Sequence, residues 1–265
     1  MNDVRLAATV ILVRPPLEVY LMRRSSRSAF APDAFVFPGG TVDPTDATPA
    51  ARRRTLGLRP DRLAREFRAT VAQELSSSEP PVGNDDASAL FVTALRELFE
   101  EAGVLLARDA AGDPVAAMPQ GIDLSADRAA MRRGELAFAD FLERYDWFAD
   151  ATALTLFSHW ITPASEPRRY NTHFFLAAVP ALQDPLADAY ETHDGIWMVP
   201  ARALERYAEG SLHLVYPTIK HLERLRAFDS VAAAEAYARR KPVLTVMPAA
   251  QGDDFVIPEA LENAW

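Results

Sequence analysis

Apolar residues recur along this chain with two spacings, and each spacing predicts a different kind of element. Short runs rich in β-branched and aromatic residues predict strands near 5–13, 17–23, 34–38, 154–161, 172–179, 196–199 and 243–247. Apolar residues three or four positions apart predict helices near 60–75, 85–102, 125–149, 201–208, 217–228 and 230–240. The first two strands are expected to pair across Pro15-Pro16, and the strands at 154–161 and 172–179 are close enough to pair. Strands interleaved with helices are typical of an α+β fold, here an α/β/α sandwich.

One predicted helix carries three carboxylates on a single face. Glu97, Glu100 and Glu101 stand at i, i+3 and i+4, so they fall within about one third of the helix circumference. The apolar residues of this helix cluster on a different face, and they are Phe91, Leu95, Leu98, Phe99 and Ala102. Like charges at these spacings repel, and a divalent cation would remove the repulsion. Hard oxygen ligands of this kind suit Mg²⁺ or Mn²⁺.

Two neighbouring features favour a functional role over a solvated acidic surface, which is the commoner meaning of such a cluster. Gly103 stands where a helix C-cap is expected, and the apolar run 104–106 follows it. The cluster therefore belongs to the end of a packed helix. Upstream, the β-type run 35–37 leads into a Pro-Gly-Gly turn at 38–40. This pattern predicts a strand that turns sharply, with glycines that allow the backbone to approach a ligand closely.

The turn and the acidic helix together resemble the Nudix box, the metal-binding signature of the Nudix hydrolases. The family pattern is Gly, five residues, Glu, seven residues and then Arg-Glu-U-x-Glu-Glu-x-Gly-U, where U is aliphatic. Gly40 supplies the first glycine, and the run from Arg96 to Val104 fills every fixed position of the second half. Asp46 stands where the pattern has its first Glu, and the 49 residues 47–95 replace the seven-residue spacer.

A divided box of this form resembles one branch of the family, the CoA and acyl-CoA diphosphatase-like Nudix proteins. Two further segments, within 21–43 and 160–175, are similar to that branch. The resemblance implies a Nudix-type α/β/α sandwich with a mixed sheet, in a single domain over 1–265. It also implies two helical insertions, at 47–84 and 108–150, because a loop of that length without structure of its own is unusual in a compact domain.

Each insertion carries an apolar helical stripe that needs a partner. The stripe of the first is Leu63, Phe67, Val71 and Leu75, and that of the second includes Phe138, Phe141 and Leu142. We expect the two stripes to pack together as a cap beside the sandwich. A cap at that place would border the site and shape the pocket for the non-phosphate part of a substrate.

The resemblance also implies roles for individual residues. Glu97 and Glu101, one helical turn apart, are the expected direct metal ligands, and Glu100 is expected to bind a second ion or hold a bound water. The carbonyl of Gly40 would add a further oxygen ligand. Arg96 lies about 100° round the helix from Glu97 and is expected to orient a carboxylate. The general base stays open, and the candidates are Glu97, Glu100, Glu166, Glu191 and Asp194.

A substrate with several phosphates needs basic partners. One arginine pair ends the strand at 17–23, and another lies in the loop between the strands at 154–161 and 172–179. Guanidinium groups suit phosphate because they bind it in bidentate fashion, although any single one is more often an ordinary surface residue. With the turn glycines, the predicted substrate-binding residues are Arg23, Arg24, Gly39, Gly40, Arg168 and Arg169.

Composition narrows the class of protein. A net charge of −9, from 37 acidic and 28 basic residues, argues against a nucleic-acid-binding surface. The absence of cysteine excludes disulfides, thiol catalysis and thiolate metal sites. No apolar run approaches the roughly 20 residues that span a bilayer, so we expect a cytoplasmic protein without a membrane partner. The sequence leaves the oligomeric state open, with a homodimer as one alternative.

Three hypotheses on function follow. The leading one is a Mg²⁺- or Mn²⁺-dependent Nudix diphosphatase that acts on CoA, acyl-CoA or a related small nucleoside-diphosphate derivative. The second keeps this chemistry and changes the substrate to ADP-ribose, NADH or a nucleotide sugar. The third is a non-catalytic Nudix-fold binding module. The complete glutamate triplet disfavours the third, because a module without catalysis need not keep a self-repelling acidic face.

Overall fold

In the computed structural model, the first strand lies in the middle of the main sheet. β1 (Val4–Arg14) pairs antiparallel with β2 (Glu18–Arg24) and parallel with β9 (Arg169–Ala178). The sheet order is β10-β2-β1-β9-β8-β11, while β3 pairs with β2 and β4 pairs with β1. These further strands are β3 (Phe35–Val36), β4 (Gly39–Thr41), β8 (Thr155–Ile161), β10 (Thr192–Met198) and β11 (Thr245–Val246). The predicted pairings of β1 with β2 and of β8 with β9 are confirmed.

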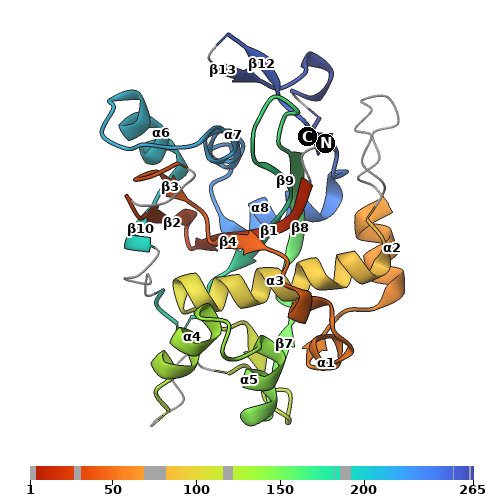
Figure 1. Ribbon diagram of the computed structural model, residues 1–265. Helices are drawn as coiled ribbons and strands as arrows, with labels where there is room; N and C mark the ends of the chain where they lie inside the picture. Colours follow the sequence, from red (N-terminus) through yellow and green to blue (C-terminus); the bar gives the residue numbers. More distant parts are fainter. Residues whose placement is uncertain are drawn as a thin grey trace.

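Helices cover both faces of this sheet (Figure 1). Alternate residues of β1 face opposite layers: Val10 packs in the core beneath α3 (Asn84–Ala102), and Ile11 packs in a second core on the other face. The second core is covered by α6 (Pro200–Ala208), α7 (Tyr216–Leu225) and α8 (Val231–Arg240). The predicted α/β/α sandwich with a mixed sheet is therefore confirmed. The structure describes residues 4–26, 31–68, 82–115, 122–181, 183–185, 192–252, 254–262 and 264–265.

The two predicted insertions meet in a small sheet of their own. β7 pairs with both β5 and β6, which gives three strands in the order β5-β7-β6. The elements of this region are α1 (Pro49–Arg53), β5 (Thr55–Leu56), α2 (Pro60–Arg68), β6 (Ala107–Arg108), α4 (Ser125–Arg132), α5 (Phe138–Arg144) and β7 (Phe148–Asp150). The single helix expected over 125–149 is two helices, because Gly134 takes a left-handed conformation (φ 69°) just after α4.

The aromatic residues of the two insertion stripes pack on α3. Phe67 meets Phe91 of α3 edge-on with ring centroids 6.1 Å apart, and Phe141 stacks on Phe99 at 5.0 Å. This differs from the predicted contact between the stripes themselves. The reason is that α3 is buried all round over residues 87–96, so it offers an apolar surface to both insertions at once. Val71 and Leu75 lie outside the described residues.

Several short elements had no clear signal in the sequence. They are η1 (Pro44–Ala47), η2 (Ala151–Ala153), β12 (Ala249–Gln251), β13 (Asp254–Val256) and η3 (Glu259–Leu261). β12 and β13 form a separate antiparallel pair. Among the helices in the described part of the chain, none is both long and apolar enough to cross a bilayer.

A lysine that follows α8 has its ammonium group buried against aromatic residues. The ammonium group of Lys241 lies 4.9 Å from the ring centre of Phe157, 5.8 Å from Tyr237 and 6.0 Å from Trp265. Its Nζ has no hydrogen-bond partner among the described residues. Burial, with a smaller contribution from the positive charge of Arg224, lowers the pKa of Lys241 from 10.5 to about 7. The three aromatic faces compensate part of the cost of holding this charge.

Lys241→Met is therefore expected to stabilise the fold. At pH 7 the free energy of unfolding should rise by about 2 to 4 kcal/mol, because Met fills the space without an unpaired charge. The folded pKa lies below the unfolded value, so the unfolded chain binds more protons between pH 7 and 10.5 and the parent gains stability with pH there. The difference in free energy of unfolding between Lys241→Met and the parent should therefore become smaller as the pH rises. Urea unfolding at several pH values measures this, with Lys220→Met, which breaks a partly exposed pair with Glu223, as control.

Candidate active site

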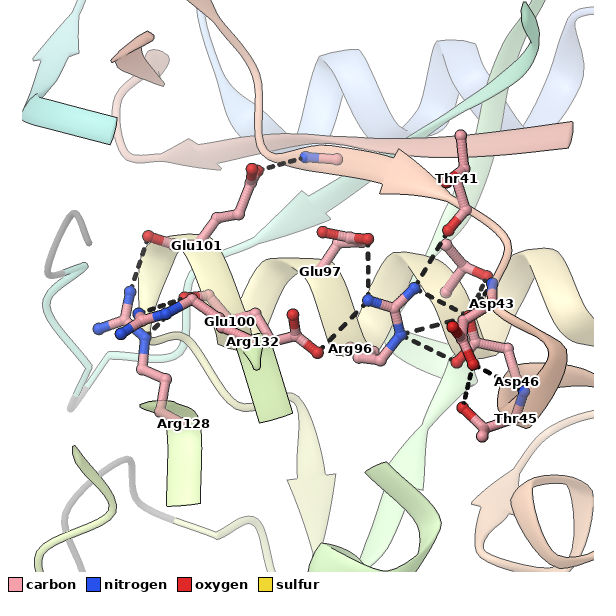
Figure 2. Close-up of polar contacts among 12 residues, drawn as sticks. Thr41, Asp43, Thr45, Asp46, Arg96, Glu97, Glu100, Glu101, Arg128 and Arg132 are labelled. Atoms are coloured by element: carbon pink, nitrogen blue, oxygen red, sulfur yellow. Dashed lines mark hydrogen bonds and ion pairs between the residues drawn. The ribbon is translucent and has the colours of Figure 1, made fainter. Parts of the chain in front are cut away.

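Two consecutive glycines bring β4 against the acidic helix. The backbone N–H of Gly39 donates to Glu101 Oε2 at 2.7 Å. Gly40 lies against Glu97 so closely that a Cβ at this position would collide with its carboxylate. Gly103 ends α3 in a left-handed conformation (φ 68°), and its N–H donates to the carbonyl of Phe99 at 2.9 Å. The turn glycines were expected to let the backbone approach a ligand closely. In the structure, the groups that this backbone approaches are carboxylates of α3 (Figure 2).

Arg96 is the centre of a buried hydrogen-bond network. Its Nη1 donates to Glu97 Oε1 at 2.8 Å and to Glu100 Oε1 at 3.3 Å. Its Nη2 donates to the carbonyl of Thr41 at 3.2 Å, so the same guanidinium also fixes the end of β4. The residue is only 8% exposed. Arg96 therefore sets the orientation of two of the three glutamates relative to the glycine turn (Figure 2).

Asp46 anchors this arginine from the other side. Asp46 is 1% exposed, and its two carboxylate oxygens accept from Arg96 Nε and Nη2, each at 2.9 Å. It also accepts from Thr93 Oγ1 at 2.8 Å and, as part of the capping box of η1, from the N–H of Asp43 at 3.0 Å. Residues 46 and 93 are thus neighbours in space although the first insertion separates them.

Burial, together with negative charge nearby, raises the pKa of one glutamate. The pKa of Glu100 rises from 4.5 to about 7, chiefly because the carboxyl is buried and secondly because Glu97 and Asp46 are negative nearby. The positive charge of Arg96 opposes this effect without cancelling it. Three carboxylates, those of Asp46, Glu97 and Glu100, share the single positive charge of Arg96, and a bound cation would stabilise such an arrangement.

The donor set suits a hard divalent cation. Within the described part of the chain, no three His, Cys, Asp or Glu side chains converge as a ready-made metal cage. Mg²⁺ that works on phosphates does not need one, because it is usually bound by one or two carboxylates, water and the phosphates themselves. Glu101 offers a carboxylate beside Gly39, and Glu97 offers one beside Gly40. These residues fit such an ion in chemical type and charge.

Two arginines that sequence reasoning missed lie at the end of α3. Arg128 and Arg132, both on α4, donate to backbone carbonyls of the last turn of that helix (Figure 2). Their i, i+4 spacing places them on one helix face, but no sequence signal indicates what that face contacts. The second insertion is thereby tied to the acidic helix through polar contacts as well as through the packing of Phe141.

The predicted substrate-binding arginines are dispersed. Consecutive strand residues face opposite ways, so Arg23 and Arg24 lie on different faces of β2, and Arg24 shares the face of Tyr20 that turns towards α3. Arg23 forms an ion pair with Asp33 at 2.7 Å. Arg169 donates through Nε to the carbonyl of Thr162 at 3.1 Å, across the base of the β8–β9 hairpin. Arg168 is exposed in the same hairpin.

The candidates for the general base are also separated. Glu97 and Glu100 are both in the Arg96 network. Glu166 lines an apolar cavity of about 490 Å³ with Trp160 and Phe174, which belong to the core on the sheet face opposite α3. Asp194 takes a left-handed conformation (φ 54°) at the bulge of β10. Glu191 lies outside the described residues.

Comparison with known proteins places the chain in a family. A family model described as the NUDT19 Nudix domain matches residues 3–225. The chain belongs to the Nudix hydrolases. This Nudix chain is 31% identical over 241 residues to the acyl-coenzyme A diphosphatase NUDT19 of Gallus gallus, with 81% of the chain and 62% of the relative aligned. It is 28% identical to the human protein of the same name, with 82% and 64% aligned. The chain thus spans roughly three fifths of the length of these curated relatives.

One solved structure matches the Nudix chain over nearly its whole length. The Nudix hydrolase of Alicyclobacillus acidocaldarius is 31% identical and superimposes with a TM-score of 0.71. The match covers 89% of this chain and 97% of that protein. The identity and coverage support the same family independently.

Proposed function

We propose that this Nudix chain is a divalent-metal-dependent diphosphatase that cleaves the pyrophosphate linkage of CoA or acyl-CoA. The observation that carries the proposal is the network in which Asp46 fixes Arg96, and Arg96 in turn fixes Glu97 and Glu100 beside the glycine turn. A solvated acidic surface would need no such buried support. The substrate class is supported by the curated relatives, both of which carry the name acyl-coenzyme A diphosphatase.

The reaction is a substitution at phosphorus. The oxygen of a water molecule forms a bond to one phosphorus, the bridging P–O bond breaks, the bridging oxygen leaves with the other phosphate, and one proton is released. With CoA, the products are 4'-phosphopantetheine and adenosine 3',5'-bisphosphate. A divalent cation, when bound, would neutralise the charge that spreads over the phosphate oxygens and activate the attacking water.

The residues of the chain supply position and proton acceptance. Glu101 is held by the N–H of Gly39, and Glu97 is held by Arg96, so both carboxylates are directed to the glycine turn. We assign the metal-ligand role to these two and to the carbonyl of Gly40. Glu100 is the third carboxylate of the acidic face and accepts from Arg96 Nη1 at 3.3 Å, beside Glu97. We assign proton acceptance to Glu100. On β2, we assign the phosphate contact to Arg24, because this residue lies on the face towards α3.

A substrate panel tests the proposal. The chain is incubated with CoA, acyl-CoA, ADP-ribose, NADH and a nucleotide sugar, each with Mg²⁺ or Mn²⁺, and products are identified by mass. We expect kcat/KM for CoA or acyl-CoA to exceed that for the other diphosphates by about tenfold or more, a difference of about 1.4 kcal/mol. H₂¹⁸O identifies the attacked phosphorus from the labelled product. A preference for ADP-ribose or NADH would contradict the proposed CoA specificity and support the second hypothesis on substrate. Metal-independent binding without turnover of any compound would favour the non-catalytic module.

A further inference from the structure

The last turn of α3 is bound by side chains from another element. Helix carbonyls near a C-terminus lack partners within the helix, and in α3 these include the carbonyls of Glu100 and Glu101. Arg128 Nε donates to the carbonyl of Glu100 at 2.8 Å, and Arg128 Nη2 donates to that of Glu101 at 2.7 Å. Arg132 Nη1 adds a longer contact of 3.4 Å to the carbonyl of Glu100. All three bonds join α4, in the second insertion, to the acidic helix (Figure 2).

The charges in this arrangement are complementary. A helix C-terminus carries partial negative charge, and three carboxylates on the last two turns of α3 increase it. The last turn of α3 contains no basic residue of its own. Two guanidinium groups from α4 therefore supply the cations that the helix lacks. They do so at backbone atoms, which leaves the carboxylate of Glu101 directed to the opposite side, where it accepts from Gly39.

The forked geometry of Arg128 has a further consequence for position. One guanidinium holds the carbonyls of two consecutive residues, so it fixes the orientation of the peptide unit between them and of the Cα–Cβ bond of Glu101. Glu101 is consequently restrained at both ends, by Arg128 at its backbone and by Gly39 at its carboxylate. Outer contacts of this kind orient metal ligands and can change metal affinity or activity 10–100-fold, as an order of magnitude.

We propose that Arg128 is a positioning residue for the metal-binding end of α3, through which the second insertion controls the geometry of Glu101. The inference rests on the proposed function in that the site is the same metal site. Arg128 acts through the backbone of Glu101. The second insertion then has a role in the chemical step in addition to any role in substrate selection.

Three variants test this inference. Arg128→Met keeps the length of the side chain and removes all donors, whereas Arg128→Lys keeps the charge but cannot hold two carbonyls with one planar fork. The matched control is Arg133→Met, which removes an arginine next to α4 whose partner is the exposed Glu135. The Kd for Mn²⁺ is measured by electron paramagnetic resonance of the free ion. Amide hydrogen exchange is measured over residues 97–104, and kcat and KM are measured with CoA.

Arg128→Met should raise the Kd for Mn²⁺ about tenfold and lower kcat about tenfold, with KM for CoA within about twofold. Exchange over 97–104 should be faster. Arg128→Lys should recover only part of each loss, because charge without the fork does not fix the peptide unit. Arg133→Met should match the parent within about twofold in every measurement, as exposed substitutions generally do.

An Arg128→Met variant with the Kd, kcat and exchange of the parent would overturn the inference, as would equal losses in Arg133→Met. Full recovery by Arg128→Lys would replace the positioning role with a purely electrostatic one. If Arg128→Met does not fold, Arg128→Lys and Arg132→Met carry the test, and parent-like values in both would reject the proposal. Mn²⁺ affinity and exchange do not depend on the substrate, so failure of CoA hydrolysis in the parent would reject the proposed function separately.

Discussion

Glu101→Gln is expected to reduce metal-dependent hydrolysis by about 100-fold or more, a loss of about 2.7 kcal/mol in transition-state stabilisation. The substitution preserves shape and helix propensity, and the amide oxygen of glutamine can still accept from the N–H of Gly39. What it removes is one negative charge from the proposed metal site. The free energy of unfolding should therefore stay within about 1 kcal/mol of the parent value, because removing one of three like charges on a helix face costs little.

The measurement is turnover at saturating Mg²⁺ and Mn²⁺, together with the melting temperature as a function of metal concentration. An ion that binds only the folded state stabilises it, so the parent should melt at a higher temperature with metal. Glu97→Gln/Glu101→Gln should show a much smaller rise. Glu205→Gln changes an exposed residue of α6. It is the control and should behave like the parent. Near-normal turnover of Glu101→Gln at saturating Mg²⁺ would refute the ligand assignment.

Asp46→Ala is expected to destabilise the fold by about 3 to 5 kcal/mol, the usual cost of removing one partner from a buried ion pair. The substitution leaves the guanidinium of Arg96 inside the protein without the carboxylate that accepts two of its hydrogen bonds. It also removes the acceptor of Thr93 Oγ1 and the capping box of η1. Hydrolysis should fall as well, because Arg96 then no longer holds Glu97 and Glu100 in place.

Urea unfolding measures the change, with Asp85→Ala as control. Asp85 also forms an ion pair with an arginine, Arg52, but is exposed, so its removal should cost about 0 to 1 kcal/mol. A double variant separates stability from function. Asp46→Leu/Arg96→Met replaces both charges with apolar groups but leaves Glu97 and Glu100 without Arg96, so it should recover only part of the stability and none of the activity. If Asp46→Ala unfolds within 1 kcal/mol of Asp85→Ala, the buried pair is not the support that the proposed site requires.

Much of the fold followed from the sequence because the periodicity of apolar residues is a local property. Apolar runs on either side of Pro15-Pro16 were enough to predict two paired strands, and the i, i+3, i+4 pattern was enough to place the acidic helix and its end at Gly103. The same local pattern identified Glu97, Glu100 and Glu101 on one helix face, beside a glycine turn whose function as a close contact depends only on the absence of side chains.

The periodicity of apolar residues does not show which surfaces of two elements contact each other in the folded protein. The apolar stripe of α2 was evident in the sequence, but its partner was decided by α3, a helix buried all round and therefore able to accept both insertions. For the same reason nothing in the sequence singled out Arg128 and Arg132. Their role depends on the position of a helix end from a distant part of the chain.

Asp46 shows most directly where the sequence reached its limit. It stands in place of the family glutamate and 49 residues separate it from Arg96, yet it is the buried partner of Arg96. The entropic cost of closing a loop grows only slowly with its length, so a 49-residue separation says little about distance in space. The sequence by itself determined the chemical types and local order of the site residues. Only the tertiary structure decided which of them meet, because those contacts depend on packing between elements that no local pattern encodes.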